Sequence, residues 1–194
     1  ARERHAESIA LFRALQDHWG LGFALYLDGM AAYWQGNYAA AQAAYEESII
    51  LFRAIGDKWR AAGPLGRLGD LVYRQGRITE AHRLYTESLA LFREASDKSG
   101  IATSLNPLGA VALQNGDLDQ AAAYYQESLS INQELGDKQG LAWAHFGLGN
   151  VSFRRRDFEH AASQLQRALA LLSDVGDGGG MTWVIQFMGQ VNCA

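Results

Sequence analysis

The side chains from which a catalytic or metal-binding site is usually built are scattered in this chain. A zinc site needs histidines and cysteines at short, regular spacing. The five histidines show no such spacing, and the single cysteine, Cys193, has no second cysteine beside it. Neither can we name a nucleophile with a fixed base and an orienting acid. We therefore expect no cofactor, no metal and no enzymatic activity.

The glycine-rich stretch GDGGG at residues 176–180 invites comparison with a phosphate-binding loop. Such a loop continues with Lys and then Ser or Thr, and it follows a strand. Here that continuation is missing, and the stretch follows a helical pattern. We interpret it as a flexible junction.

Charge argues against some classes of partner. Arg154, Arg155 and Arg156 form the strongest basic cluster, which we interpret as a solvated face; contact with an acidic peptide or a phosphate is the alternative if Arg154 points into a groove. The net charge of −4 offers little general attraction to nucleic acid or anionic lipid. With no signal segment, no long apolar run and one cysteine, the sequence predicts a cytoplasmic protein that binds neither membrane nor, directly, nucleic acid.

The chain is built from a strict repeat, and the elements of this repeat would position any binding residues. Aspartate, glycine and alanine each recur at intervals of 40 positions without an insertion. The columns are Asp17, Asp57, Asp97, Asp137 and Asp177; Gly29, Gly69, Gly109, Gly149 and Gly189; and Ala1, Ala41, Ala81, Ala121 and Ala161. A fixed period of this length is typical of a solenoid, in which each unit buries its apolar face against its neighbours.

Each repeat unit is expected to contain two helices. In residues 97–116 and 117–136, apolar residues recur at helical spacing and each stretch ends in glycine. The recurring aspartate is well placed to cap the first helix, and Asp117 with Gln120 resembles a capping box for the second. The glycines that can close the first helices in a left-handed conformation are Gly36, Gly76 and Gly116.

These columns resemble the tetratricopeptide repeat family. A Leu-Gly pair is followed by an alanine twelve residues on, then by an aromatic residue and a small residue, as in Leu68, Gly69, Ala81, Tyr85 and Ser88. The resemblance covers essentially the whole chain. It departs from the commonest form in its unit length of 40 residues instead of about 34 and in lacking the proline that ends the second helix. The longer form is similar to repeats in bacterial multidomain regulators and signalling proteins.

The resemblance implies an all-α fold, a right-handed helical solenoid of antiparallel helix pairs with about ten helices. The phase of the repeat divides this single repeat domain (1–194) into a half unit (1–16), four units (17–56, 57–96, 97–136 and 137–176) and a second half unit (177–194). Because the chain begins with Ala1 and neither end carries a polar capping element, we expect a fragment of a longer protein. Ends that bury themselves in a dimer are the alternative.

The first helix of each unit carries two stripes, because each residue turns by about 100°. One stripe holds apolar residues such as Leu65, Leu68 and Val72, and we predict that it packs in the core. The other is richer in aromatic residues. By resemblance, the corresponding stripe of tetratricopeptide proteins lines a concave face where peptides bind. Aromatic residues with an arginine are also the composition expected at the energetic centre of an interface.

This second stripe supplies the candidate partner-binding residues. They are Phe23, Tyr26, Met30, Tyr33, Trp34, Tyr73, Asn106, Trp143, Phe146, Asn150, Phe153, Arg154 and Trp183. The alternative is that these rings pack against the neighbouring helix; we favour the groove because the packing stripe is already filled. Small or polar residues at Gly63, Gly66, Asp70 and Thr103 would leave room in the middle for a bulky element of the partner.

Two features interrupt the regular pattern. Pro64 and Pro107 fall inside first helices, where we interpret them as local bends and a hinge is the alternative. Asp28 stands in an otherwise apolar column and His5 in a column of tyrosines. The two either form a charge-assisted bond or are partly solvated near the end of the chain, and we favour solvation.

The sequence therefore predicts a non-catalytic scaffold or sensor module of a larger bacterial signalling or regulatory protein. The expected partner is a protein or peptide held on the concave face. Two alternatives remain: a self-assembly element that forms a homo-oligomer through its termini, and a receptor for a short signalling peptide or small molecule.

Overall fold

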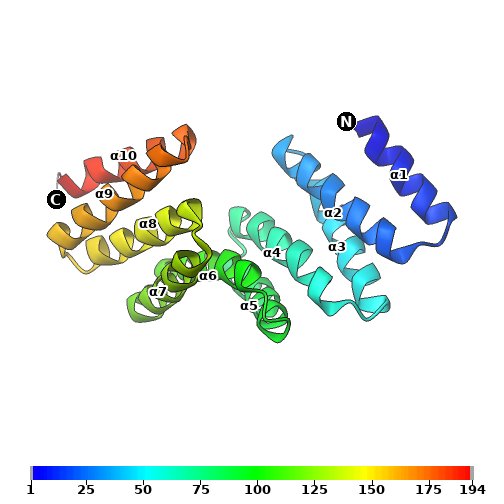
Figure 1. Cartoon of the computed structure of the whole chain (residues 1–194), viewed down its shortest axis with the longest axis horizontal. Coiled ribbons are helices and arrows are strands. Elements are labelled where there is room, and N and C mark those ends of the chain that lie inside the picture. Colours follow the sequence, from blue (N-terminus) through cyan, green and yellow to red (C-terminus); the bar gives the residue numbers. More distant parts are fainter. Residues whose placement is uncertain (1, 193–194) are drawn as a thin grey trace. The chain divides into compact units, whose positions relative to one another are not determined.

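The structure, a computed structural model, describes the backbone of residues 2–192 and the side chains of residues 6–191. This part of the chain contains ten helices and no strand, so the predicted all-α class is confirmed (Figure 1). In chain order the helices are α1 (Arg2–Ala14), α2 (His18–Trp34), α3 (Tyr38–Ala54), α4 (Lys58–Arg74), α5 (Ile78–Glu94), α6 (Lys98–Gln114), α7 (Leu118–Leu135), α8 (Lys138–Arg154), α9 (Phe158–Asp174) and α10 (Gly178–Asn192).

The helices form two compact units, α1–α5 in residues 1–96 and α6–α10 in residues 97–194. Within the first unit, α2 pairs with α3 and α4 with α5, while in the second α6 pairs with α7 and α8 with α9 (Figure 1). Each helix also packs against the helix that follows it in its unit. This is the packing of successive antiparallel pairs that the repeat predicts.

The aspartate column caps the first helices as predicted. An Asp17 carboxylate oxygen accepts a hydrogen bond from the backbone N–H of Gly20 at 2.9 Å, and Asp97 does the same for Gly100 at 3.0 Å. The capping box expected at Asp117 is half correct. Its carboxylate accepts from the N–H of Gln120 at 3.0 Å, but its own N–H donates to the carbonyl of Ala112 at 2.9 Å.

The turns that close the first helices need a left-handed backbone. Gly36, Gly76 and Gly116 have φ angles of 75°, 78° and 81°, where glycine has no steric cost. Arg156 occupies the corresponding position after α8 with φ of 65°. The arginine therefore holds a conformation that strains a residue with a Cβ atom.

The repeated glycines allow the two helices of a unit to approach closely. A Cβ atom on Gly69 would lie 2.6 Å from the ring of Tyr85, and one on Gly109 would lie 2.6 Å from Tyr125. The small column is explained in the same way, because the Ser88 hydroxyl donates to the carbonyl of Ala62 at 2.8 Å in a buried position. The glycine and tyrosine columns thus pack together in three successive repeats, whereas in the fourth Gly149 meets Leu165.

The packing stripe lies in the core as predicted. Leu65, Leu68 and Val72 on α4 are at most 7% exposed, and so are Leu105 and Leu108 on α6. Pro64 and Pro107 lie inside α4 and α6, and both helices continue through them.

Candidate binding faces

The candidate residues of the first unit lie on two helices that contact each other, α2 and α4. On α2, Phe23 is 43% exposed and Trp34 is 81% exposed. Tyr26, Met30 and Tyr33 on α2 and Tyr73 on α4 are half-buried. The stripe is therefore neither a free surface nor a core, but a partly packed face with an exposed ring near each end.

Tyr26 is a candidate residue that packs within the solenoid. Its ring centroid lies 6.3 Å from that of Tyr45 on α3, and a Cβ atom on Gly63 of α4 would lie 3.5 Å from it. The ring thus fills space that the small Gly63 leaves open. Tyr26 therefore occupies part of the space beside Gly63 that the sequence analysis assigned to a bulky element of the partner.

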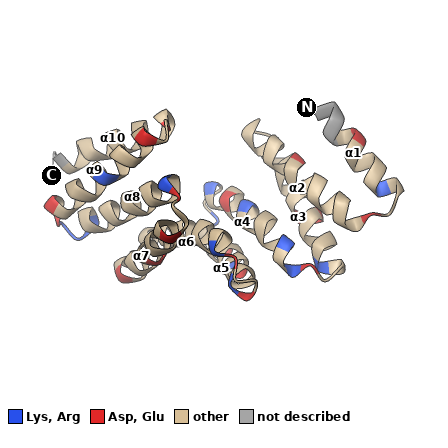
Figure 2. Cartoon of the chain, in the orientation of Figure 1, with Lys and Arg blue, Asp and Glu red and all other residues tan. Residues whose placement is uncertain are grey.

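A row of arginines on α4 faces a row of aromatic rings on α2. We call it the arginine ladder: Arg60 with Trp19, Arg67 with Tyr26, and Arg74 with Tyr33. Members of each row are seven residues apart, which on a helix is about two turns. Figure 2 shows basic residues along α4 and none along α2.

Each rung of the ladder has a direct contact. The Arg60 guanidinium lies 5.0 Å from the ring centroid of Trp19, and the Arg74 guanidinium lies 5.8 Å from that of Tyr33. Arg67 interacts with Tyr26 by charge and by a side-chain hydrogen bond. Contacts of a cation with an aromatic face are favourable. The ladder thus holds α2 and α4 together along the face that carries the candidate residues.

The rungs differ in their acidic partners. Arg60 forms an ion pair with Asp57 at 2.9 Å, and Arg67 forms one with Asp70 at 3.1 Å. In the part of the chain that the structure describes, no acidic side chain pairs with Arg74, which lies instead over Tyr33 and, at 5.5 Å, over Tyr38. One guanidinium of the three therefore keeps its charge uncompensated.

The middle rung continues into a partly buried network. The Tyr85 hydroxyl donates to Asp70 at 2.9 Å. Burial raises the pKa of Asp70 above its ordinary value of 3.8, although Arg67 and Tyr85 oppose the change. Burial by itself lowers the pKa of Arg67, but Asp70 and Tyr26 raise it by more. The pKa of Tyr85 is raised by burial and by Asp70.

The last rung belongs to a cluster that we call the aromatic corner: Tyr33, Trp34, Tyr38 and Arg74. The Tyr33 ring centroid lies 5.7 Å from Trp34 and 5.6 Å from Tyr38, with edge-to-face geometry in both pairs. Such pairs contribute beyond simple burial. The corner is therefore ordered by its own contacts while Trp34 stays exposed.

The first unit also contains pockets. One, of about 160 Å³, is lined mainly by apolar side chains of α1 and α2, among them Phe12, Trp19, Phe23 and Leu27. The rings of Trp19 and Phe23 are stacked there, with centroids 5.9 Å apart. Phe23, at one end of the candidate face, thus also borders a concave apolar surface.

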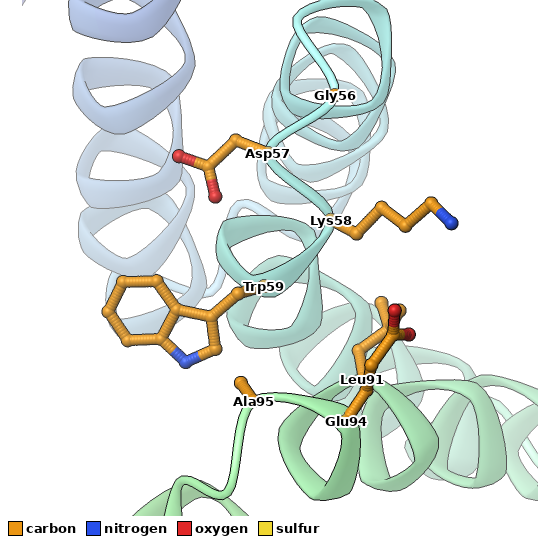
Figure 3. A pocket seen from close by; sticks show the side chains of 7 residues that line it. All are labelled: Gly56, Asp57, Lys58, Trp59, Leu91, Glu94 and Ala95. Carbon is orange, nitrogen blue, oxygen red and sulfur yellow. The ribbon is translucent and has the colours of Figure 1, made fainter.

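Another pocket, of about 460 Å³, lies between the start of α4 and the end of α5. Figure 3 shows Lys58 extending away from Trp59, and Glu94 beside Leu91. In the second unit the equivalent positions are joined by ion pairs, Lys98 with Glu134 at 2.6 Å and Lys138 with Asp174 at 2.8 Å. Among the described residues, no ion pair joins Lys58 and Glu94, so the pocket lies where the two repeats of the second unit have an ion pair.

The three candidate rings on α8 pack against neighbouring rings of the second unit. Phe146 and Phe153 on α8 contact Phe187 on α10, with ring centroids 5.6 and 5.4 Å apart, and both pack against a buried cluster around Leu165. Trp143 meets the ring of Phe146 edge to face at 5.9 Å. These contacts are the ones that the core interpretation of the stripe describes.

The remaining candidates of the second unit vary in exposure. Trp183 is 66% exposed, Arg154 is exposed, and Asn150 is half-buried. Asn106 is also half-buried, and its side-chain oxygen is shielded from solvent without a hydrogen-bond partner among the described residues. Of the arginine cluster, Arg155 pairs with Asp119 on α7; all three arginines are exposed, as on a solvated face.

Sequence reasoning missed the residues that organise the first face. Trp19, Arg60, Arg67, Arg74 and Tyr38 were not among the candidates, although the interval of seven was visible within each helix. What the sequence did not show is which positions of α2 and α4 meet. The expected solvation of Asp28 and His5 stays a prediction, as does the alternative of a bond between them, because the His5 side chain lies outside the described residues. Cys193 also lies outside them.

Two further findings concern metals and membranes. In residues 6–191, no three side chains among the histidines, aspartates and glutamates are grouped so as to hold a metal ion. None of the described helices combines the length and hydrophobicity that crossing a bilayer requires.

Comparison with known proteins gives matches of sequence pattern and of fold. A family model described as Tetratricopeptide repeat matches residues 23–94 and 100–174. No curated protein sequence matches significantly.

Among solved structures, BtubC (BKLC) from P. vanneervenii has a TM-score of 0.73 at 19% identity, over 98% of this chain and 89% of BtubC. The apo form of RapI has a TM-score of 0.70 at 14% identity, over 95% of this chain and 53% of RapI. A Rap protein complexed with Competence and Sporulation Factor has a TM-score of 0.78 at 14% identity, over 89% of this chain and 49% of the Rap protein. The chain thus spans about half the length of these two Rap structures.

Proposed function

The chain belongs to the tetratricopeptide repeat family. We propose that it is a non-catalytic module that binds a protein or peptide partner through the second, aromatic-rich stripe of the first helices of its repeats. The observation that carries the proposal is the face of α2 and α4, where exposed Phe23 stacks on Trp19 and exposed Trp34 meets Tyr33, both rings of the arginine ladder. Exposed aromatic side chains beside arginine are what protein interfaces use as anchors. The ladder holds these anchors in place, which lowers the entropy cost of binding.

The module would serve as a sensor or scaffold in a larger cytoplasmic regulatory or signalling protein of a bacterium. The Rap protein complexed with Competence and Sporulation Factor shares this fold at 14% identity, and the proposed context is drawn by analogy with it. A receptor for a short signalling peptide is a special case of the same proposal, in which the partner is a free ligand.

The test is affinity capture from a bacterial lysate with paired baits, followed by mass spectrometry. The baits are the parent chain, a Phe23→Ala, Trp34→Ala double variant and an Ile50→Ala control. Ile50 is 65% exposed and lies on α3, outside the stripe. We expect a partner retained by the parent and the control but lost from the double variant. Helix content by circular dichroism should be equal in all three, because the replaced side chains are exposed.

Equal retention on all three baits would contradict binding through this face. It would favour the second candidate function, self-assembly through the end helices. That alternative has its own support, because Leu11 on α1 is 58% exposed, Leu15 in the turn after α1 is 65% exposed, and Ile185 on α10 is 54% exposed. Isolated exposed apolar residues are ordinary, so the alternative depends on a direct measurement of mass.

A further inference from the structure

The three rungs of the arginine ladder are chemically alike, but only two of the three arginines have a carboxylate partner. Arg60 and Arg67 each contact an aromatic ring and also pair with a carboxylate, Asp57 at 2.9 Å and Asp70 at 3.1 Å. Arg74 has the aromatic contacts without a carboxylate from the described part of the chain. The face therefore offers one place where an acidic group from outside would complete an existing pattern.

The geometry at Arg74 favours such a group. Its guanidinium lies over two rings, 5.8 Å from Tyr33 and 5.5 Å from Tyr38. Arg74 also forms side-chain hydrogen bonds with Tyr33 and Tyr38. Because a guanidinium carries five N–H donors in its plane, donors remain at its edge for a further acceptor. A carboxylate can accept two of these donors at once. The rings thus orient the arginine before any partner arrives.

A large apolar surface adjoins this charge. Trp34 is 81% exposed, the highest value among the large apolar side chains that the structure describes as exposed. Its ring meets Tyr33 edge to face, with centroids 5.7 Å apart, so one ring face is not used in that contact. An apolar side chain of a partner could cover it while a neighbouring acid reaches Arg74.

We propose that the aromatic corner recognises an aspartate or glutamate side chain of a partner segment that carries an apolar side chain next to the acid. The carboxylate binds the edge of Arg74, and the apolar group covers Trp34. This inference rests on the proposed function and specifies the partner chemistry at one end of the α2 and α4 face.

The probe is a displayed library of random short peptides, selected against the full chain. Parallel selections use Arg74→Gln and the matched control Arg83→Gln. Arg83 lies on α5 with 66% of its side chain exposed, so its loss changes the net charge equally without touching the corner. We expect acid-plus-apolar pairs to be enriched by the parent and by Arg83→Gln, and not by Arg74→Gln.

An enriched peptide is then synthesised with an amidated C-terminus, together with a version in which the acid is replaced by its amide. Loss of a charge-assisted hydrogen bond should raise Kd roughly ten- to a hundredfold. We expect that rise for the amide version on the parent chain, and no further rise when the amide version meets Arg74→Gln. Arg74→Lys, which keeps the charge but not the planar fork, should recover only part of the affinity.

Three results overturn the inference. One is enrichment of peptides without an acid, a second is an acid preference that survives Arg74→Gln, and a third is dependence on a free C-terminal carboxylate. In each of these cases the proposed function still stands if binding is lost in the Phe23→Ala, Trp34→Ala variant. If no peptide is enriched at all, both this inference and the peptide-binding form of the proposed function are wrong.

Discussion

Single atoms decide how closely the helices of one repeat can approach. A methyl group at Gly69 would lie 2.6 Å from the Tyr85 ring, which must then move and give up its bond to Asp70. A methyl group at Gly66 would lie 3.4 Å from the Ser88 hydroxyl, an ordinary contact. The same chemical change should therefore have opposite effects at two positions of α4.

We predict that Gly69→Ala lowers the free energy of unfolding by about 1–2 kcal/mol, because overpacking outweighs the better helix propensity of alanine. Gly66→Ala should raise it by up to about 1 kcal/mol. Urea unfolding followed by circular dichroism measures both. Equal effects of the two substitutions would contradict the packing of Tyr85 on Gly69.

The charge of Asp70 makes stability depend on pH. Because burial raises its pKa above 3.8 in the folded chain, the folded state binds the proton more tightly than the unfolded state. The contribution of Asp70 is thus most favourable below pH 3.8, and it declines as pH rises through the raised pKa.

We predict that the unfolding free energy of the parent, minus that of Asp70→Asn, falls as pH rises across this window. Asparagine keeps an oxygen for the Tyr85 hydroxyl but cannot ionise. The difference is measured by urea titrations of both proteins from pH 4 to pH 8. A difference that grows with pH would show that Arg67 and Tyr85 outweigh burial.

At the scale of helices, the turn after α8 carries a strained residue. Arg156 has φ of 65°, where the other first helices with a described turn have glycine. Arg156→Gly should raise the unfolding free energy by about 1 kcal/mol, because a left-handed conformation costs a residue with a Cβ atom roughly that much.

The matched control for this turn is Arg155→Gly, one residue earlier. Arg155 has an ordinary φ of −79° and pairs with Asp119. That substitution should lower stability, because glycine adds flexibility to the unfolded chain and removes the ion pair. If both glycine variants lose stability, the backbone at Arg156 is not strained.

The sequence predicted these helices well because each signal was local. An aspartate that caps a helix and a glycine that ends it act within a few residues, and both recur every 40 positions. The buried stripe of Leu65, Leu68 and Val72 followed from helical spacing alone. The arginine ladder did not, because it depends on which residues of α2 and α4 face each other across the repeat. For the same reason, the sequence could not show that Phe146 and Phe153 pack on Phe187.

At the scale of the whole molecule, the end helices test the alternative function. If the chain self-assembles through its ends, its average mass in light scattering should rise with concentration. Leu15→Lys combined with Ile185→Lys should abolish that rise, because charge is costly in an apolar contact. Ile50 on α3 is similarly exposed, and Ile50→Lys should leave the rise of mass with concentration unchanged. A constant monomer mass in the parent would exclude this assembly at the concentrations measured.

The unequal rungs of the arginine ladder also affect the alignment in which an extended peptide would bind. Rungs seven residues apart on a helix are separated by about 10 Å, and an extended chain covers that distance in about three residues. Three identical rungs would let such a chain slip by three residues and bind in several alignments. Asp57 and Asp70 neutralise two of the three. A ligand laid along α2 and α4 would then have a single preferred alignment and a fixed polarity, defined by ion pairs that it never touches.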